Sequence, residues 1–134
     1  MTLHARDAAS WKVAAPYVRS GGAWVLALSV SARDAGSWKI VAQILTSVLI
    51  TGTTTVANGA TVNLGTTVTG GYGSLTYLWA KTSGTGSISG SATNSTVTIN
   101  SGANNAEGNY QVTVTDSLTG TAIVEPVVVT WGTP

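Results

Sequence analysis

The sequence predicts an all-β protein in two modules, a short one of β-hairpins and a larger one of two packed antiparallel sheets. Charged residues are only 8% of the chain, which has 16 Gly and is rich in Thr, Ser and Val. This is the composition of a β protein with many turns. A short unit recurs three times before residue 40, and beyond it short alternating runs are separated by turn clusters. No segment has a helical period.

The repeated unit is an Arg, four small or turn-forming residues and a Trp. Its copies span Arg6–Trp11, Arg19–Trp24 and Arg33–Trp38. The Asp, Ser, Gly and Ala residues inside each copy favour a tight turn. Stretches between copies, such as residues 24–30, favour extended strands. The module is therefore predicted to be an antiparallel β-hairpin repeat meander.

We expect the turns at residues 7–10, 20–23 and 34–37, each flanked by an Arg and a Trp in opposite positions. Two interpretations of this pairing stay open. A guanidinium over an indole adds roughly 0.5–1 kcal/mol at an exposed site, or the tryptophans simply cover a thin sheet. The spacing from Trp24 to Arg33 puts the two on opposite faces of one strand unless a bulge intervenes, so the meander is expected to be bent.

The first module, residues 1–46, is small and basic. Its five basic residues against two acidic ones give a charge of +3, whereas residues 47–134 hold one basic and three acidic residues, giving −2. This imbalance is too weak to predict nucleic-acid binding. Roughly 40 residues is the lower limit for folding without staples. The module should therefore find its missing burial on the second module, on copies of itself or on another protein.

Several functional classes are disfavoured by composition. The chain has no cysteine, which excludes disulfides, thiol catalysis and thiolate metal sites. No secretory signal is expected, because His4, Arg6 and Asp7 interrupt the start and no apolar core follows. The most apolar run, residues 40–50, is too short for a membrane helix. We expect a soluble protein without membrane insertion.

The second module, residues 47–134, has the pattern of a β-sandwich. Short strands are predicted at residues 60–68, 75–81, 96–99, 109–115 and 122–131, with Gly- and Ser-rich turns between them.

The order of residues in this module resembles an immunoglobulin-like domain over roughly residues 48–132. The resemblance implies that Thr66 and Val112 occupy the positions of the two cysteines of the antibody type. It also implies that Trp79 is the core tryptophan and Tyr110 the tyrosine-corner residue. The absent disulfide departs from the antibody type and leaves the core dependent on packing.

The first module resembles the Trp-rich repeats of tailed-phage virion proteins, such as minor tail and fibre-like components. Immunoglobulin-like domains are also frequent appendages of phage capsid and tail proteins. Together the two resemblances imply a non-enzymatic structural protein located in the virion. The repeats would anchor it to other virion proteins, and the immunoglobulin-like domain would project from them.

The chain offers few groups for catalysis. Its one histidine, His4, lies near the start, and its five carboxylates are scattered. A glycosidase pair from Glu107 and Glu125 stays an alternative without support from spacing. Asp116 is expected to cap the turn after its strand. We therefore predict no catalytic, cofactor-binding or metal-binding residues, and no cofactor.

The predicted contacts are with partners. Tyr72, in a Gly-rich loop, is a possible ligand contact, for instance with a host-surface glycan, or it folds back over the edge of the core. Homo-oligomerisation is expected, with a trimer favoured. Two alternative functions stay open: a bacterial surface or secreted adhesion module, and a carbohydrate-binding accessory domain. The predicted partner-binding residues come from the three repeats: Arg6, Trp11, Arg19, Trp24, Arg33 and Trp38.

Overall fold

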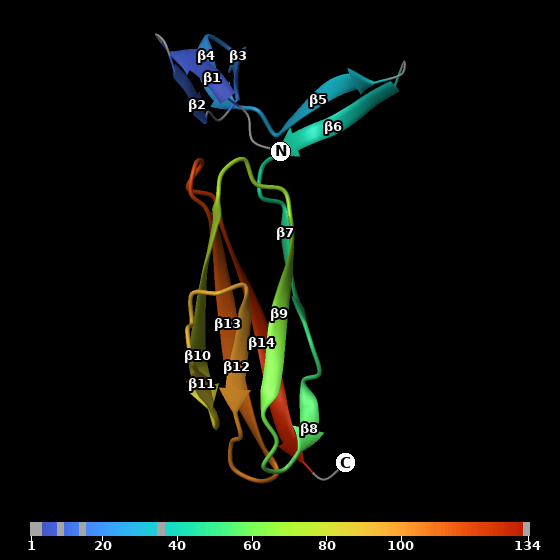
Figure 1. Ribbon diagram of the computed structural model, residues 1–134, viewed down its shortest axis with the longest axis vertical. Coiled ribbons are helices and arrows are strands. Elements are labelled where there is room, and N and C mark those ends of the chain that lie inside the picture. Colours follow the sequence, from blue (N-terminus) through green and yellow to red (C-terminus); the bar gives the residue numbers. More distant parts are fainter. Residues whose placement is uncertain (1–3, 8–9, 14–15, 35–36, 133–134) are drawn as a thin grey trace. The chain divides into compact units, whose positions relative to one another are not determined.

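The fold is all-β, as predicted, in a computed structural model (Figure 1). The structure describes residues 4–7, 10–13, 16–34 and 37–132, and within these ranges every regular element is a strand. Side chains are described for residues 16–31 and 42–132.

The chain divides into two compact units. One unit comprises the chain up to Ser47 together with the segments Thr69–Leu75 and Thr115–Ala122; the other comprises the remaining residues from Val48 onward. The sequence boundary predicted at residue 46 lies next to the boundary at Ser47. The prediction did not assign the two later segments to the first unit, because nothing local in their sequence relates them to the hairpins.

The first six strands form three hairpins, each with an Arg opposite a Trp. The register pairs Arg6 with Trp11, Arg19 with Trp24, and Arg33 with Trp38, so the predicted hairpins and turn positions are confirmed for the backbone. The strands are β1 (His4–Asp7), β2 (Ser10–Val13), β3 (Tyr17–Ser20), β4 (Ala23–Leu26), β5 (Ser29–Asp34) and β6 (Ser37–Gln43).

The second hairpin shows why the repeat folds in this way. Gly21 and Gly22 connect β3 to β4, with φ values of 57° and 87°. Positive φ at both central residues matches the two-residue turn whose twist suits a hairpin, and glycine adopts it without a steric cost. The central turn residues of the other two hairpins lie outside the described residues.

The predicted meander is not found among the described residues, because the three hairpins are separate two-stranded sheets. The strand expected over residues 24–30 is interrupted: β4 ends at Leu26 and β5 begins at Ser29. At this break the backbone changes partner, since the N–H of Ala27 donates to the carbonyl of Pro16 and the carbonyl of Leu28 accepts from the N–H of Ile44. A register shift between Val30 and Ser31 adds the irregularity that the spacing had predicted.

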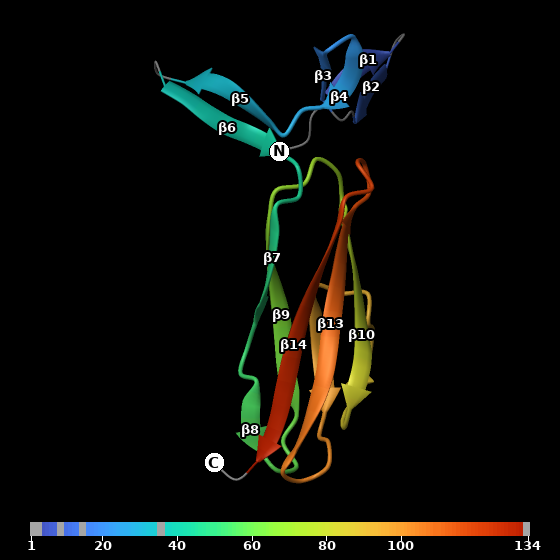
Figure 2. The ribbon, with the colours of Figure 1, turned by 180° about the vertical axis from the view of Figure 1, so that it is seen from behind.

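The remaining strands form two four-stranded sheets that face each other (Figures 1 and 2). Their orders are β10-β13-β14-β8 and β11-β12-β9-β7, and β8 runs parallel to β14. The strands are β7 (Ser47–Thr51), β8 (Thr55–Ala57), β9 (Val62–Thr69), β10 (Leu75–Gly84), β11 (Ser87–Ser89), β12 (Thr96–Asn100), β13 (Ala106–Asp116) and β14 (Ala122–Gly132).

Alternate residues of these strands are buried. On β13 every second residue from Gly108 to Asp116 is buried. This is the pattern of strands with one face packed on a core. The side chains that share the core come from both sheets: Val62, Leu64, Val97, Ile99, Tyr110, Val112, Val114, Val129 and Trp131.

Trp79 is buried, as predicted, with 2% of its surface exposed. Its indole N–H donates to the carbonyl of Asn94 at 3.0 Å. Val112 is fully buried, whereas Thr66 is only half-buried and its hydroxyl donates to the carbonyl of Ser95 at 3.1 Å. A hydroxyl with a carbonyl partner near the surface avoids the cost of an unpaired polar group inside the core.

Tyr110 has a different partner from the one its tyrosine-corner assignment implies. That corner bonds a carbonyl a few residues upstream, but the hydroxyl of Tyr110 donates to the distant carbonyl of Thr85, at 2.9 Å. The neighbouring Gly86 has φ of 78°, and a Cβ there would meet the hydroxyl of Tyr110 and the ring of Trp131. The missing side chain therefore lets the connection between β10 and β11 approach the ring.

Candidate functional site

The second hairpin exposes apolar side chains on both of its faces. Paired residues of a hairpin share a face, and so do alternate residues along a strand. One face thus carries Tyr17 and Trp24, which are 56% and 71% exposed, and the other carries Val18 and Val25, which are 50% and 42% exposed. Among the described residues, both faces of this hairpin therefore leave apolar side chains at least two-fifths exposed.

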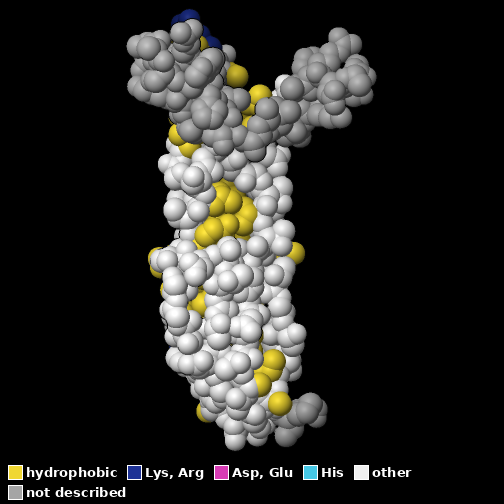
Figure 3. Space-filling view, viewed as in Figure 1, with side chains coloured by type: hydrophobic (Ala, Val, Ile, Leu, Met, Phe, Trp, Pro, Cys, Tyr) yellow, Lys and Arg dark blue, Asp and Glu magenta, His cyan; other side chains and the backbone are white. Residues whose placement is uncertain are grey.

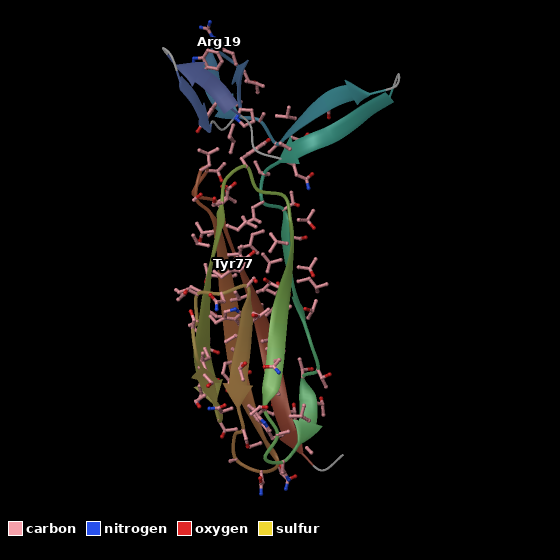
Figure 4. All side chains as sticks on the ribbon, in the orientation of Figure 1. Arg19 and Tyr77 are labelled. Carbon is pink, nitrogen blue, oxygen red and sulfur yellow. The ribbon has the colours of Figure 1, made fainter. Side chains whose placement is uncertain are left out.

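Arg19 lies directly opposite Trp24 and shares its face. Figure 4 labels Arg19 on this hairpin, and Figure 3 shows a small group of dark-blue basic atoms at the corresponding end of the view. Both side chains are exposed. An exposed guanidinium beside an exposed indole combines two of the side chains most enriched at binding hot spots. For Arg6, Trp11, Arg33 and Trp38 the structure describes the backbone pairing alone.

Tyr72 is buried and belongs to the same unit as the hairpins. Its ring is 1% exposed, and its hydroxyl donates to the carbonyl of Ala27 at 2.9 Å. Ala27 is the buried residue at the break between β4 and β5. Burial raises the pKa of the Tyr72 hydroxyl, which keeps it a donor. These contacts favour the interpretation in which Tyr72 folds back over the edge of the core rather than contacting a ligand.

Asp116 holds the loop that carries Tyr72. Its carboxylate is fully buried and accepts hydrogen bonds from three backbone N–H groups, those of Tyr72 at 2.7 Å and of Gly73 and Leu118 at 2.9 Å. Burial alone would raise the pKa of this carboxyl. The bonds from these N–H groups and from the side chain of Thr119 outweigh it, so the pKa lies below its usual value.

The predicted role of Asp116 as a turn cap is confirmed by its bond to Leu118. Its bonds to Tyr72 and Gly73 were not predicted, because those residues lie 44 and 43 positions away in the sequence. The only local signal was the Gly-rich composition of residues 70–73. At Gly73 a Cβ would meet the Asp116 carboxylate and Leu118, so this close approach requires a residue without a side chain.

Backbone bonds join the same loop to the end of the hairpin region. The N–H of Gly71 donates to the carbonyl of Gln43, and the N–H of Thr46 donates to the carbonyl of Thr69. Gly70 has φ of 87°, and a Cβ there would meet the carbonyl of Ile44. Hydrogen bonds thus connect the Tyr72 loop to the Asp116 turn, to the break between β4 and β5, and to the end of β6.

The remaining acidic side chains form no metal-binding group in the part of the chain that the structure describes. No group of three or more His, Asp or Glu side chains there is arranged to hold a metal ion. Glu107 accepts a hydrogen bond from the hydroxyl of Thr130 at 3.3 Å. In the same part of the chain, no helix is long and apolar enough to cross a bilayer.

The chain matches no protein-family model, and comparisons with curated proteins and with solved structures also find no match.

Proposed function

We propose that this protein is a non-enzymatic structural component of a tailed-phage virion. The hairpins of residues 1–46 anchor it to other virion proteins, and residues 47–134 display an immunoglobulin-like sandwich. The observation that carries the proposal is the second hairpin, whose tyrosine, tryptophan and valine side chains are exposed on two faces.

The physical argument concerns burial. A two-stranded hairpin is marginally stable at best in water, and it gains stability when its apolar side chains are packed. Large exposed apolar patches generally mark interaction sites. The Arg–Trp pair recurs at the same register in all three hairpins. A pairing kept three times in one chain favours a shared mode of binding to a repetitive partner surface.

Strand order supports the immunoglobulin-like part of the proposal. In chain order, β7, β9, β12 and β11 correspond to strands A, B, E and D of that fold, and β10, β13 and β14 correspond to C, F and G. The two sheets of the fold hold ABED and CFG, which matches the order observed here except for the additional strand β8 beside β14. In this correspondence Trp79 lies on strand C, the strand that carries the core tryptophan of the family.

The test compares purified virions with infected-cell lysate by quantitative mass spectrometry. The protein should be enriched in virions, and Trp24→Ala should reduce its occupancy. Leu49→Ala is the matched control, because Leu49 is similarly exposed, at 59%, on β7. Absence of the protein from virions, or equal incorporation of Trp24→Ala and the control, would refute the anchoring role.

A truncation lacking residues 1–46 is a less direct test. It removes the carbonyl groups of Ala27 and Gln43, which accept hydrogen bonds from Tyr72 and Gly71. Loss of incorporation by this variant therefore counts for the proposal only if hydrogen exchange shows its two large sheets to be intact.

A further inference from the structure

The second hairpin departs from the other two on one face. In the first and third hairpins, the pairs on the face opposite the Arg–Trp pair are Ala5 with Lys12 and Ala32 with Lys39. The corresponding pair in the second hairpin is Val18 with Val25.

The neighbouring pair on the same face differs in the same direction. The first and third hairpins pair Asp7 with Ser10 and Asp34 with Ser37, whereas the second pairs Ser20 with Ala23. At these register positions the outer hairpins thus each carry one acidic and one basic residue, and the central hairpin carries no charge. The positions that hold an alanine and a lysine in the outer hairpins hold Val18 and Val25 in the central one. Both valines are about half exposed, at 50% and 42%.

We propose that this face is a self-association surface, on which the second hairpin packs against the second hairpin of another copy of the chain. We call it the valine face, formed by Val18, Ser20, Ala23 and Val25. A symmetric pair uses the same patch on both copies, so each residue of the patch contacts a residue of that same patch on the other copy. The valine face has no charge in a segment of net charge +3, so two copies that meet there bring no like charges into contact.

The arrangement leaves the other face free. Tyr17, Arg19 and Trp24 point away from the valine face, so a paired hairpin still presents the Arg–Trp face that the three repeats share. The Arg–Trp face, which all three hairpins share, then binds other virion proteins. The valine face, which only the second hairpin has, binds a second copy of the chain. Because the face consists of only four residues, the association belongs to the weak, concentration-dependent class of interfaces.

The repeats themselves supply the test variants. Val25→Lys and Ser20→Asp each install the residue found at the same register position in the outer hairpins, where the hairpin still forms. Leu49→Lys, on β7, is the control for adding a charge at an exposed apolar position.

Sedimentation velocity of the full chain over a concentration series gives the readout. The wild type and Leu49→Lys should shift toward a dimer as concentration rises, and both valine-face variants should weaken the association at least tenfold. A wild type that stays monomeric at the highest soluble concentration would overturn the inference. So would a Val25→Lys or Ser20→Asp variant that associates as the wild type does.

Cross-linking identifies the face directly. The sequence has no cysteine, so a single introduced cysteine reports on its own position. Val25→Cys should form a disulfide-linked dimer under mild oxidation, and Trp24→Cys, the adjacent residue on the opposite face, should form much less. The reverse order would assign self-association to the Arg–Trp face and overturn the inference. Both experiments use the isolated protein, so their outcome is independent of incorporation into virions.

Discussion

In both the second hairpin and the two large sheets, side chains alternate between two faces of the strands, but only the large sheets bury one of these faces. On β13 alternation separates a buried row from a partly exposed row. On β3 every residue is exposed, and on β4 only Leu26 is partly covered. Both regions have the side-chain period of a strand, yet only the large sheets have a second sheet to pack against. The difference shows that strand formation in this chain does not itself provide a core.

Trp79→Ala should produce the largest loss of stability, because Trp79 lies in the packed core of the large sheets. A small loss would contradict the contrast drawn between these sheets and the second hairpin. Removing a buried tryptophan costs about 3–5 kcal/mol through lost packing and the cavity left behind. The neighbouring Leu78 is 54% exposed, so Leu78→Ala is the matched control with an expected cost within about 1 kcal/mol. Urea unfolding followed by far-UV circular dichroism measures both. Equal costs would show that the observed burial of Trp79 does not contribute to stability.

Asp116→Asn should have the next largest effect, on the unit that contains the hairpins. An amide has one oxygen in place of the two that accept the three backbone bonds, and each buried donor left unpaired costs roughly 1–3 kcal/mol. Hydrogen exchange at the amides of Tyr72, Gly73 and Leu118 should become faster. Unchanged protection of these amides would contradict the role assigned to the carboxylate.

The same variant gives a dependence on pH. The pKa of Asp116 is lowered in the folded protein from its usual 3.8, so its ionised form contributes stability above that value and loses it as pH falls through the folded pKa. The difference in unfolding free energy between wild type and Asp116→Asn should be constant from pH 7 to about 5 and shrink below about 4. A difference that grows on acidification would contradict the sign of the shift.

Tyr72→Phe should have a smaller effect confined to the contact with the hairpins. The variant keeps the buried ring and removes only the hydroxyl that donates to Ala27, a loss of roughly 1–2 kcal/mol. Amide exchange should accelerate around residues 26–30 and stay unchanged at Gly73, whose bond to Asp116 remains. Tyr17→Phe, on an exposed tyrosine, is the control and should alter neither.

Trp24→Ala should have the smallest effect on stability, in contrast to the replacement of the buried Trp79. The side chain is 71% exposed, so its truncation should change the unfolding free energy of the isolated protein by about 0.5 kcal/mol or less. Its effect should appear instead in incorporation into virions. A loss as large as that of Trp79→Ala would mean that the hairpin is covered within the chain.

Local features of the sequence were sufficient to predict the hairpins. The Arg-to-Trp spacing and the small residues inside it set a tight turn, and a tight turn sets the register on both sides of it. The three Arg–Trp pairs therefore appear where the sequence places them. The meander is not found among the described residues, since it requires the hairpins to pair with one another and no local pattern specifies such pairing.

The sequence by itself determined the all-β class, the register of each hairpin and the turn cap at Asp116, since these follow from side-chain period and turn chemistry within a few residues. The burial of Trp79 was expected only from the resemblance to an immunoglobulin-like domain. Only the tertiary structure decided the break at Ala27 and the use of Tyr72 and Asp116 to hold it. The hydroxyl of Tyr72 and the carbonyl of Ala27 lie 45 residues apart, and the Asp116 carboxylate lies 44 residues beyond the amide it binds. Such bonds depend on where distant backbone groups remain unpaired after the strands have formed, and a buried backbone group must find a partner wherever the fold provides one.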